Sequence, residues 1–289
     1  MKRASDADVA IALDRVRAET NVALRRAADP VSFVHRFTRP IDQELVALLS
    51  AAIAFGNVVS IRRSIEDVLR RLGPTPADAI VDLAATQRLL DGFVHRLLRG
   101  DDIARLLVGA RAIQKSDQTL GRFFEASFAR MGDLRASLAE MCDAIREHGG
   151  LVRSTRGRRG PLHVLPDARG PSANKRMMLF LRWMIRPADG VDLGLWRVPP
   201  SALVIPLDTH IQKLSRNLGF TKRKDASFRT ATEVTKALAR FDPQDPVKYD
   251  FALCHLGMLK RCPSRRDETR CHGCAVKPVC RHWRGNSRG

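Results

Sequence analysis

Four cysteines near the C-terminus are the residues of this sequence that most directly indicate chemistry. They are Cys262, Cys271, Cys274 and Cys280, in the pattern C-x8-C-x2-C-x5-C. Thiols crowded in this way, with basic residues and prolines between them, are typical of metal ligands rather than of a disulfide framework. The other two cysteines, Cys142 and Cys254, stand in apolar surroundings, and we expect both in the core.

Two metal groups accept four thiolates, and the cysteine spacing favours one of them. Zinc ribbons usually use two C-x2-C knuckles, each of which presents a pair of ligands on a tight turn. This sequence has one such knuckle, at Cys271 and Cys274, with a longer gap before it. The longer gap suits a larger cubane whose ligands are spread further apart. A 4Fe-4S cluster is therefore expected, with zinc as the alternative.

Asp208 is also placed for chemistry, because it stands directly before a stretch in which apolar residues recur at helical spacing. These apolar residues are Ile211, Leu214 and Leu218. An aspartate at this place caps the helix, which contributes about 1 kcal/mol, and the helix start favours a negative charge there. A carboxylate so placed can also stabilise positive charge that develops on a sugar and can activate water. The structural and the chemical role are compatible.

The overall charge indicates a polyanionic partner. Lys and Arg number 50 against 31 Asp and Glu, and the formal net charge is +19 with an isoelectric point near 10.8. A surface that is charged only for solubility usually needs a single-digit charge, so nucleic acid is the expected partner. A basic run interleaved with glycines is interpreted as a flexible loop for backbone contacts or, alternatively, as a loop in solvent. Its arginines are Arg153, Arg156, Arg158 and Arg159.

Helices must position these residues, because apolar residues recur at helical spacing almost throughout and strand-like alternation is nearly absent. Residues 153–165 and 186–206, rich in Gly, Pro and charge, are predicted loops. The fold is therefore expected to be all-α. The clearest predicted helical stretches are residues 61–69, ending at Gly73; residues 103–113, after a cap at Asp101; residues 120–128; and residues 134–145, ending at Gly149 and Gly150.

Neither the N-terminus nor the most apolar stretch indicates a membrane. Residues 45–55 are too few for the roughly 20 residues that span a bilayer, and the first residues lack the apolar run of a secretory signal. We therefore expect a cytoplasmic, nucleoid-associated protein without a membrane partner. No heptad seam stands out, so a monomer is expected.

The cysteine pattern resembles the C-terminal loop of the endonuclease III and adenine glycosylase branch of the helix-hairpin-helix DNA glycosylases. The usual first gap there has six residues, whereas this sequence has eight. The resemblance implies a structural 4Fe-4S cluster that helps to present a basic loop to the phosphate backbone of double-stranded DNA. The basic residues that it would assign to DNA are Arg265, Arg266, Arg270 and Lys277.

The segment around Asp208 carries a second likeness. P-L-D-T-H-I at residues 206–211 resembles the V-D-T-H segment that holds the family's catalytic aspartate, which implies that role for Asp208. Upstream, L-P-D-A-R-G-P-S-A-N at residues 165–174 partly resembles the hairpin L-P-G-V-G-[RK]-K-T-A. Pro171 then stands where bifunctional members have a Schiff-base lysine, which puts AP-lyase activity in doubt. Lys175, one helical turn further, is the candidate replacement as a catalytic lysine.

The hairpin is expected to bind phosphate despite these substitutions. Gly170 and Pro171 are predicted to open a helix whose free amides and dipole suit an anion, and Ser172 adds a hydroxyl. Together with the basic loop, the hairpin supplies the predicted DNA contacts Arg156, Arg158, Arg159, Arg169, Gly170 and Ser172.

An insertion between the hairpin and Asp208 is interpreted as part of a base pocket. It holds Asp189, Asp192 and Trp196, of which Trp196 would stack on an extruded base or, alternatively, belong to the core. R-W-M-I at residues 182–185 and G-V-D-L-G-L-W at residues 190–196 resemble an uncharacterised bacterial branch of the same superfamily, known by a domain-of-unknown-function label. That likeness covers nearly the whole chain.

These features predict an all-α, two-lobed helix-hairpin-helix glycosylase fold with a C-terminal iron–sulfur loop. One lobe, residues 41–185, is expected to be a six-helix barrel that includes the hairpin. The second lobe, residues 1–40 and 186–289, is expected to hold Asp208 and the cluster loop. The expected function is a monofunctional repair glycosylase that removes a damaged or mismatched base by C–N cleavage. A non-catalytic DNA- or RNA-binding protein on the same scaffold is the alternative.

Overall fold

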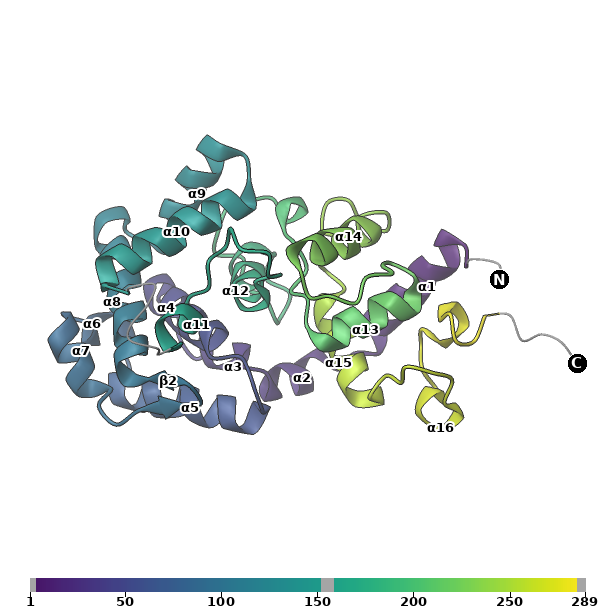
Figure 1. The fold of residues 1–289 in the computed structure, drawn as a ribbon, viewed down its shortest axis with the longest axis horizontal. Helices are drawn as coiled ribbons and strands as arrows, with labels where there is room; N and C mark the ends of the chain where they lie inside the picture. Colours follow the sequence, from purple (N-terminus) through teal and green to yellow (C-terminus); the bar gives the residue numbers. More distant parts are fainter. Residues whose placement is uncertain (1–3, 152–158, 285–289) are drawn as a thin grey trace, which may run out of the picture. The chain divides into compact units, whose positions relative to one another are not determined.

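The structure is a computed structural model that describes residues 4–151 and 159–284, and its regular elements are almost all helical (Figure 1). Within these residues the strands are β1 (Val94–His95) and β2 (Leu98–Arg99), which pair antiparallel with Val94 opposite Arg99. The predicted all-α class is confirmed. No helix in the described residues is long and apolar enough to cross a membrane.

The chain divides into two compact units. Unit 1 comprises residues 1–25, 171–178 and 199–289, and unit 2 comprises residues 26–170 and 179–198. These bounds differ from the predicted lobes, because residues 26–40 and 186–198 belong to unit 2, and because residues 171–178, predicted in the lobe of residues 41–185, belong to unit 1. The reason for the first difference is that α3 (Val31–Val34) packs on α4 (Pro40–Ala52). The reason for the second is that Trp196 is buried against side chains of unit 2.

The core of unit 2 forms around α4 and α8, whose apolar residues are almost fully buried. Residues 45–52 of α4 are buried without interruption, as expected for the most apolar stretch of the sequence. The other helices of this unit are α5 (Val58–Leu72), α6 (Pro76–Ala79), α7 (Leu83–Leu89), α8 (Gly100–Asp117), α9 (Leu120–Met131), α10 (Leu134–Gly149), α11 (Gly160–Val164) and the larger part of α12 (Lys175–Ile185).

Most of the predicted helix ends in unit 2 are confirmed. Helix α5 ends before Gly73, with φ of 77°, and α10 ends before Gly150, with φ of 62° in the left-handed region that glycine tolerates. Helix α8 differs, since it begins at Gly100 rather than after Asp101. Its start is fixed instead by Asp102, whose Oδ2 accepts the backbone N–H of Arg99 over 2.8 Å.

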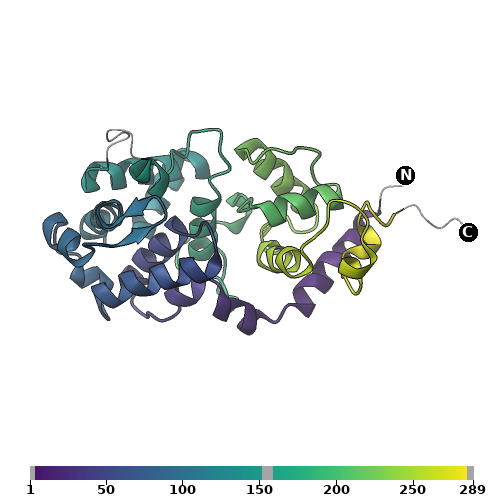
Figure 2. The same cartoon turned by 60° about the horizontal axis from the view of Figure 1, so that its bottom comes forward.

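Unit 1 is built on α13 and α15, with α1 packed on α15 (Figure 2). Helices α13 and α15 approach closely at Gly257, where an added Cβ would lie 3.0 Å from the Cβ of His210. The elements of this unit are α1 (Asp6–Glu19), the 3-10 turn η1 (Pro200–Ala202), α13 (Thr209–Leu218), α14 (Phe228–Leu238), α15 (Asp250–Lys260), α16 (Glu268–Cys271) and the 3-10 turn η2 (Lys277–Val279); α2 (Val22–Ala28) and α12 cross the division between the units.

Helices α8 and α10, which lie side by side in unit 2, meet at two glycines. A Cβ on Gly109 would lie 2.1 Å from the carbonyl oxygen of Ile145, and one on Gly149 would lie 2.1 Å from that of Arg105. Since both neighbours are backbone atoms, they cannot rotate away. The close crossing of these two helices therefore requires glycine.

Gly109→Ala is expected to lower the free energy of unfolding by about 1–3 kcal/mol, because the methyl group forces the two helix backbones apart. Denaturant unfolding followed by circular dichroism measures this change. Ser116→Ala, at an exposed position of the same helix, is the matched control and should change stability by less than about 0.5 kcal/mol. Equal midpoints for both variants would show that the crossing does not depend on the glycine.

Candidate functional site

Asp208 is the N-cap of α13, as the sequence predicted. Its Oδ1 accepts the backbone N–H of His210 over 2.8 Å and that of Ile211 over 2.7 Å. The predicted apolar face, Ile211, Leu214 and Leu218, is buried. Two amides thus fix one carboxylate oxygen of Asp208, while the residue as a whole stays only half-buried.

The second carboxylate oxygen of Asp208 faces Cys254. The Cys254 thiol lies 3.2 Å from Asp208 Oδ2 and donates to it. The sequence predicted Cys254 as an ordinary core residue, but it is only half-buried and bonded to the candidate acid. The reason is tertiary, because α15 reaches α13 through the close approach at Gly257. The one signal in the sequence is that Asp250 and Cys254 stand four residues apart, on one face of a helix.

Charges of both predicted catalytic residues act on this thiol. Burial raises the pKa of Cys254 well above its usual value, the nearby charges of Asp208 and Asp250 raise it further, and Lys175 lowers it. Lys175 and Asp208 thus both lie within electrostatic range of one sulfur atom. We call Lys175, Asp208, Asp250 and Cys254 the Asp208 cluster, and all four belong to unit 1.

The predicted hairpin differs from expectation at the start of its second helix. Helix α12 begins at Lys175, not at Gly170 and Pro171. The intervening residues are held in another way: Ser172 forms an antiparallel bridge with Ser227, and the backbone N–H of Ala173 donates to the carbonyl of Ala226 over 3.0 Å. The free amides that were predicted to follow Gly170 are therefore not helical. Ser172 itself is exposed.

The backbone just before Pro171 is clamped by one guanidinium group. Arg135 donates from Nε to the carbonyl of Ala168 over 2.7 Å and from Nη2 to the carbonyls of Arg169, over 2.9 Å, and Gly170. The side chain of Arg169 pairs with Asp143 over 2.6 Å, which raises the pKa of Arg169. This predicted DNA contact thus already has an anionic partner within the protein.

The remaining predicted contacts of the basic loop divide between described and undescribed residues. Arg159 is exposed and directly precedes α11. Arg156 and Arg158, as well as Arg153, lie outside the described residues.

The two residues of the insertion that were predicted to form a base pocket, Asp192 and Trp196, are buried. Trp196 is 3% exposed, donates from Nε1 to Glu44 over 2.9 Å, and stacks on Phe124 with ring centroids 5.2 Å apart. This is the core position that was the alternative interpretation of Trp196. Asp192 is 1% exposed and forms ion pairs with two buried arginines, Arg182 and Arg186. Both residues are enclosed by partners from unit 2, so neither offers a surface to a base.

The four clustered cysteines lie within electrostatic range of one another. The charges of Cys271 and Cys274 act on Cys262, and those of Cys262, Cys271 and Cys274 act on Cys280. Burial raises the pKa of Cys262, Cys274 and Cys280, and N–H donors act in the opposite direction. These donors are the Asn217 side chain, 3.2 Å from Cys262 Sγ, and the backbone amides of Val276, Lys277 and His282.

Such donors are the kind that stabilise metal-bound thiolates, so this loop suits a metal group held by sulfur. Within the described residues, no group of three or more His, Cys, Asp or Glu is arranged to hold a single metal ion. The assignment of a cluster or of zinc therefore stays a prediction.

The basic residues of the cysteine loop surround Trp283. The guanidinium carbon of Arg266 lies 4.2 Å, and Lys277 Nζ 4.0 Å, from the centroid of its ring. Both cations also pair with Glu268, at 3.1 and 3.8 Å. Arg265 is exposed and, in the part of the chain that is described, takes part in no ion pair. Of the predicted phosphate contacts in this loop, Arg265 is therefore the most available.

A model of one protein family matches residues 29–259, and its description is "Protein of unknown function (DUF2400)". This match covers most of the chain. The chain belongs to this family. No curated protein and no solved structure matches it.

The DUF2400 match includes the whole Asp208 cluster and the predicted hairpin, but it ends before Cys262. The four clustered cysteines thus lie beyond the matched region. The description of the family names no activity, so the function has to be argued from the residues of the site.

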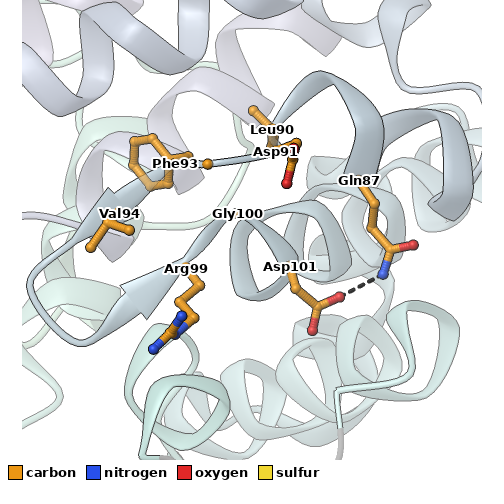
Figure 3. A pocket seen from close by; sticks show the side chains of 9 residues that line it. Gln87, Leu90, Asp91, Phe93, Val94, Arg99, Gly100 and Asp101 are labelled. Atoms are coloured by element: carbon orange, nitrogen blue, oxygen red, sulfur yellow. Dashed lines mark hydrogen bonds between the residues drawn. The ribbon is translucent and has the colours of Figure 1, made fainter.

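Unit 2 contains a cavity that is lined by other residues. Its volume is about 450 Å³, and it is lined by the β1–β2 hairpin and the start of α8 (Figure 3). Gln87 donates to Asp101 over 2.6 Å at its wall, and Arg105 pairs with the same carboxylate. Within the described chain, the residues that line this cavity include none of the predicted site residues. We therefore place the candidate site at the Asp208 cluster.

Asp208→Asn is expected to speed the alkylation of Cys254 by iodoacetamide several-fold at about pH 8.5, where thiolate is the reactive form. Removal of the negative charge lowers the pKa of this thiol, so more of it is ionised. Lys175→Met should act in the opposite direction, because it removes a charge that lowers the same pKa.

Peptide mapping by mass spectrometry separates Cys254 from the other cysteines. Cys142, fully buried and with its pKa raised to about 12, is the internal control and should stay unmodified in every variant. An alkylation rate of Cys254 that is the same in wild type and both variants would contradict the described cluster.

Proposed function

We propose that this protein excises a base from DNA by cleaving the bond between the base and deoxyribose, with Asp208 as the catalytic carboxylate. The observation that carries the proposal is the arrangement of Asp208 itself. Asp208 as a residue is only half-buried, and two backbone amides and one thiol fix the orientation of its carboxylate. Stabilising the charge that develops as a glycosidic bond breaks requires a carboxylate whose orientation is fixed in advance.

The chemistry follows from the charge that develops on the sugar. As the C–N bond breaks, its electron pair leaves with the base, and C1′ and the ring oxygen share a positive charge. Asp208 would stabilise this charge at short range, and a water molecule adds to C1′ while a carboxylate oxygen accepts its proton. Because orientation is set before the substrate arrives, little reorganisation is needed.

The role of Lys175 distinguishes two versions of this mechanism. A lyase would use its amine as a nucleophile on C1′, whereas a monofunctional enzyme would use water. Lys175 begins α12 and lies within electrostatic range of Cys254. We favour the monofunctional version. Where the hairpin of the helix-hairpin-helix glycosylases that this sequence resembles has its Schiff-base lysine, this chain has Pro171.

Charge supports DNA as the substrate. Unit 1 carries half of the lysines and arginines of the chain but well under half of its aspartates and glutamates. Exposed Ser172 and Arg265, both in this unit, are proposed backbone contacts. Backbone contacts hold the duplex in register, and the target nucleotide is then extruded toward Asp208.

We also propose that Cys262, Cys271, Cys274 and Cys280 hold a 4Fe-4S cluster. Support comes from their mutual electrostatic range and from the N–H groups directed at their sulfur atoms. Such a cluster, when bound, supplies structural ties between its four ligands and an electron-transfer centre. The protein's own residues here, Arg266 and Lys277 around Trp283, would set the shape of the basic loop.

Asp208→Asn is expected to reduce base excision by at least about 100-fold while leaving DNA binding and folding intact. Asparagine caps helices as well as aspartate does, so α13 is retained. Duplexes with deaminated, oxidised and alkylated bases, followed by alkali to cleave abasic sites, give the measurement.

Asp82→Asn is the matched control for Asp208→Asn, because Asp82 is an exposed N-cap aspartate of unit 2. It should excise bases at the wild-type rate. If wild type binds duplex DNA but leaves every base intact, the alternative of a non-catalytic binding protein is the better account. Pro171, in place of the lysine of the bifunctional glycosylases, would agree with such a loss of activity.

The cluster predicts a broad absorption band at about 400 nm after anaerobic purification. Cys262→Ser should reduce the band, and Cys142→Ser should leave it unchanged, because Cys142 is buried in the core of unit 2 and is not one of the four clustered cysteines. Iron and zinc analysis of the same samples accompanies the spectrum. A colourless protein with one zinc ion per chain would show that the four cysteines hold zinc and not a 4Fe-4S cluster.

A further inference from the structure

The segment that precedes α14 is tied to two parts of the proposed site. Phe228 donates its backbone N–H to the carbonyl of Pro171 over 2.9 Å, next to the bridge between Ser172 and Ser227. On the other side, Gln212 Nε2 donates to the carbonyls of Lys224 and Asp225, over 2.8 and 2.6 Å.

Gln212 stands four residues after Asp208, so it lies on the same face of α13. The segment of residues 222–229 therefore joins the proposed phosphate contact Ser172 to the helix that Asp208 caps. All of these residues belong to unit 1.

Asp225, the one acidic residue of the segment, forms its hydrogen bonds and its ion pair with neighbouring residues of the chain. Asp225 accepts hydrogen bonds from the hydroxyls of Ser227 and Thr230 and pairs with Arg223 over 3.0 Å. The Ser227 hydroxyl, above all, holds the pKa of Asp225 well below its usual range. Arg223 also donates from Nε to Thr230 over 3.0 Å. Asp225 and Arg223 thus neutralise each other.

Three further cations remain on the outside of the segment. Lys222, Lys224 and Arg229 are exposed, and within the described residues none of them forms an ion pair. Arg229 lies in the first turn of α14, where the helix dipole disfavours positive charge, and Lys222 and Lys224 lie in the segment that precedes this helix. A sequence that served only helix stability would place an acidic residue at this position. Arg229 therefore lowers the stability of the helix unless an anion approaches it, and the exposed Lys222 and Lys224 extend the positive charge along the same segment.

We infer that Lys222, Lys224 and Arg229 form a second contact surface for the DNA backbone, which holds a stretch of phosphates beside the strand at Asp208. This inference rests on the proposed function for its choice of DNA. Hydrogen bonds to the backbone around Ser172 and to the Gln212 side chain fix the position of this surface relative to Ser172 and to the helix that Asp208 caps. Phosphodiester groups match its charge, and each neutralised phosphate releases counterions.

The test is the salt dependence of binding to an undamaged, fluorescein-labelled duplex. The triple variant Lys222→Gln, Lys224→Gln, Arg229→Gln should flatten the plot of log affinity against log salt by about 0.9 for each lost contact. Lys236→Gln, exposed at the opposite end of the same helix, is the matched control and should keep the wild-type slope. Circular dichroism verifies that both variants are folded.

The outcomes separate this inference from the proposed function. If wild type binds DNA and the triple variant keeps its slope, the inference is overturned while base excision can still be observed. If the slope falls but wild type excises no base, the surface stands and the proposed activity fails. Binding to phosphatidylserine vesicles without binding to duplex DNA would overturn the assignment of DNA as the partner.

Discussion

The candidate site depends on one carboxylate that is held from two sides. Amides at the start of α13 fix Oδ1 of Asp208, and the Cys254 thiol on α15 meets Oδ2. The first interaction is local and needs only the helix. The second needs α15 in contact with α13, which glycine at position 257 allows because any Cβ there would meet His210. The orientation of the proposed acid is thus a consequence of how two helices pack.

In the same region, hydrogen bonds connect the proposed DNA contacts with the proposed acid, and all of these residues belong to unit 1. The backbone around Ser172 pairs with residues 226–228, and Gln212 on α13 holds the carbonyls of Lys224 and Asp225. The proposed phosphate contact Ser172, the segment of residues 222–229 and the candidate acid Asp208 are therefore linked by hydrogen bonds. In the proposed glycosylase this linkage would place the sugar relative to Asp208.

The sequence predicted features that depend on neighbouring residues in the chain. The helical class, the cap at Asp208 and the helix ends at Gly73 and Gly150 are of this kind, because capping and periodicity are local. Trp196 and Cys254 were placed less well, since their surroundings come from distant segments. Glu44 lies far away in the sequence yet binds Trp196, and Asp208 binds Cys254. The predicted start of α12 was wrong, because backbone pairing of residues 171–173 with residues 226–228 overrides the preference of Pro171 for a helix start.

The central claim, that Asp208 faces a developing positive charge on a sugar, is tested most directly by binding to a transition-state analogue. A duplex that contains a cationic pyrrolidine in place of the target sugar mimics this charge, and one with neutral tetrahydrofuran lacks it. The account predicts that wild type binds the pyrrolidine duplex at least about 100-fold more tightly, and that Asp208→Asn abolishes the difference. Equal affinities of wild type for the two duplexes would contradict it.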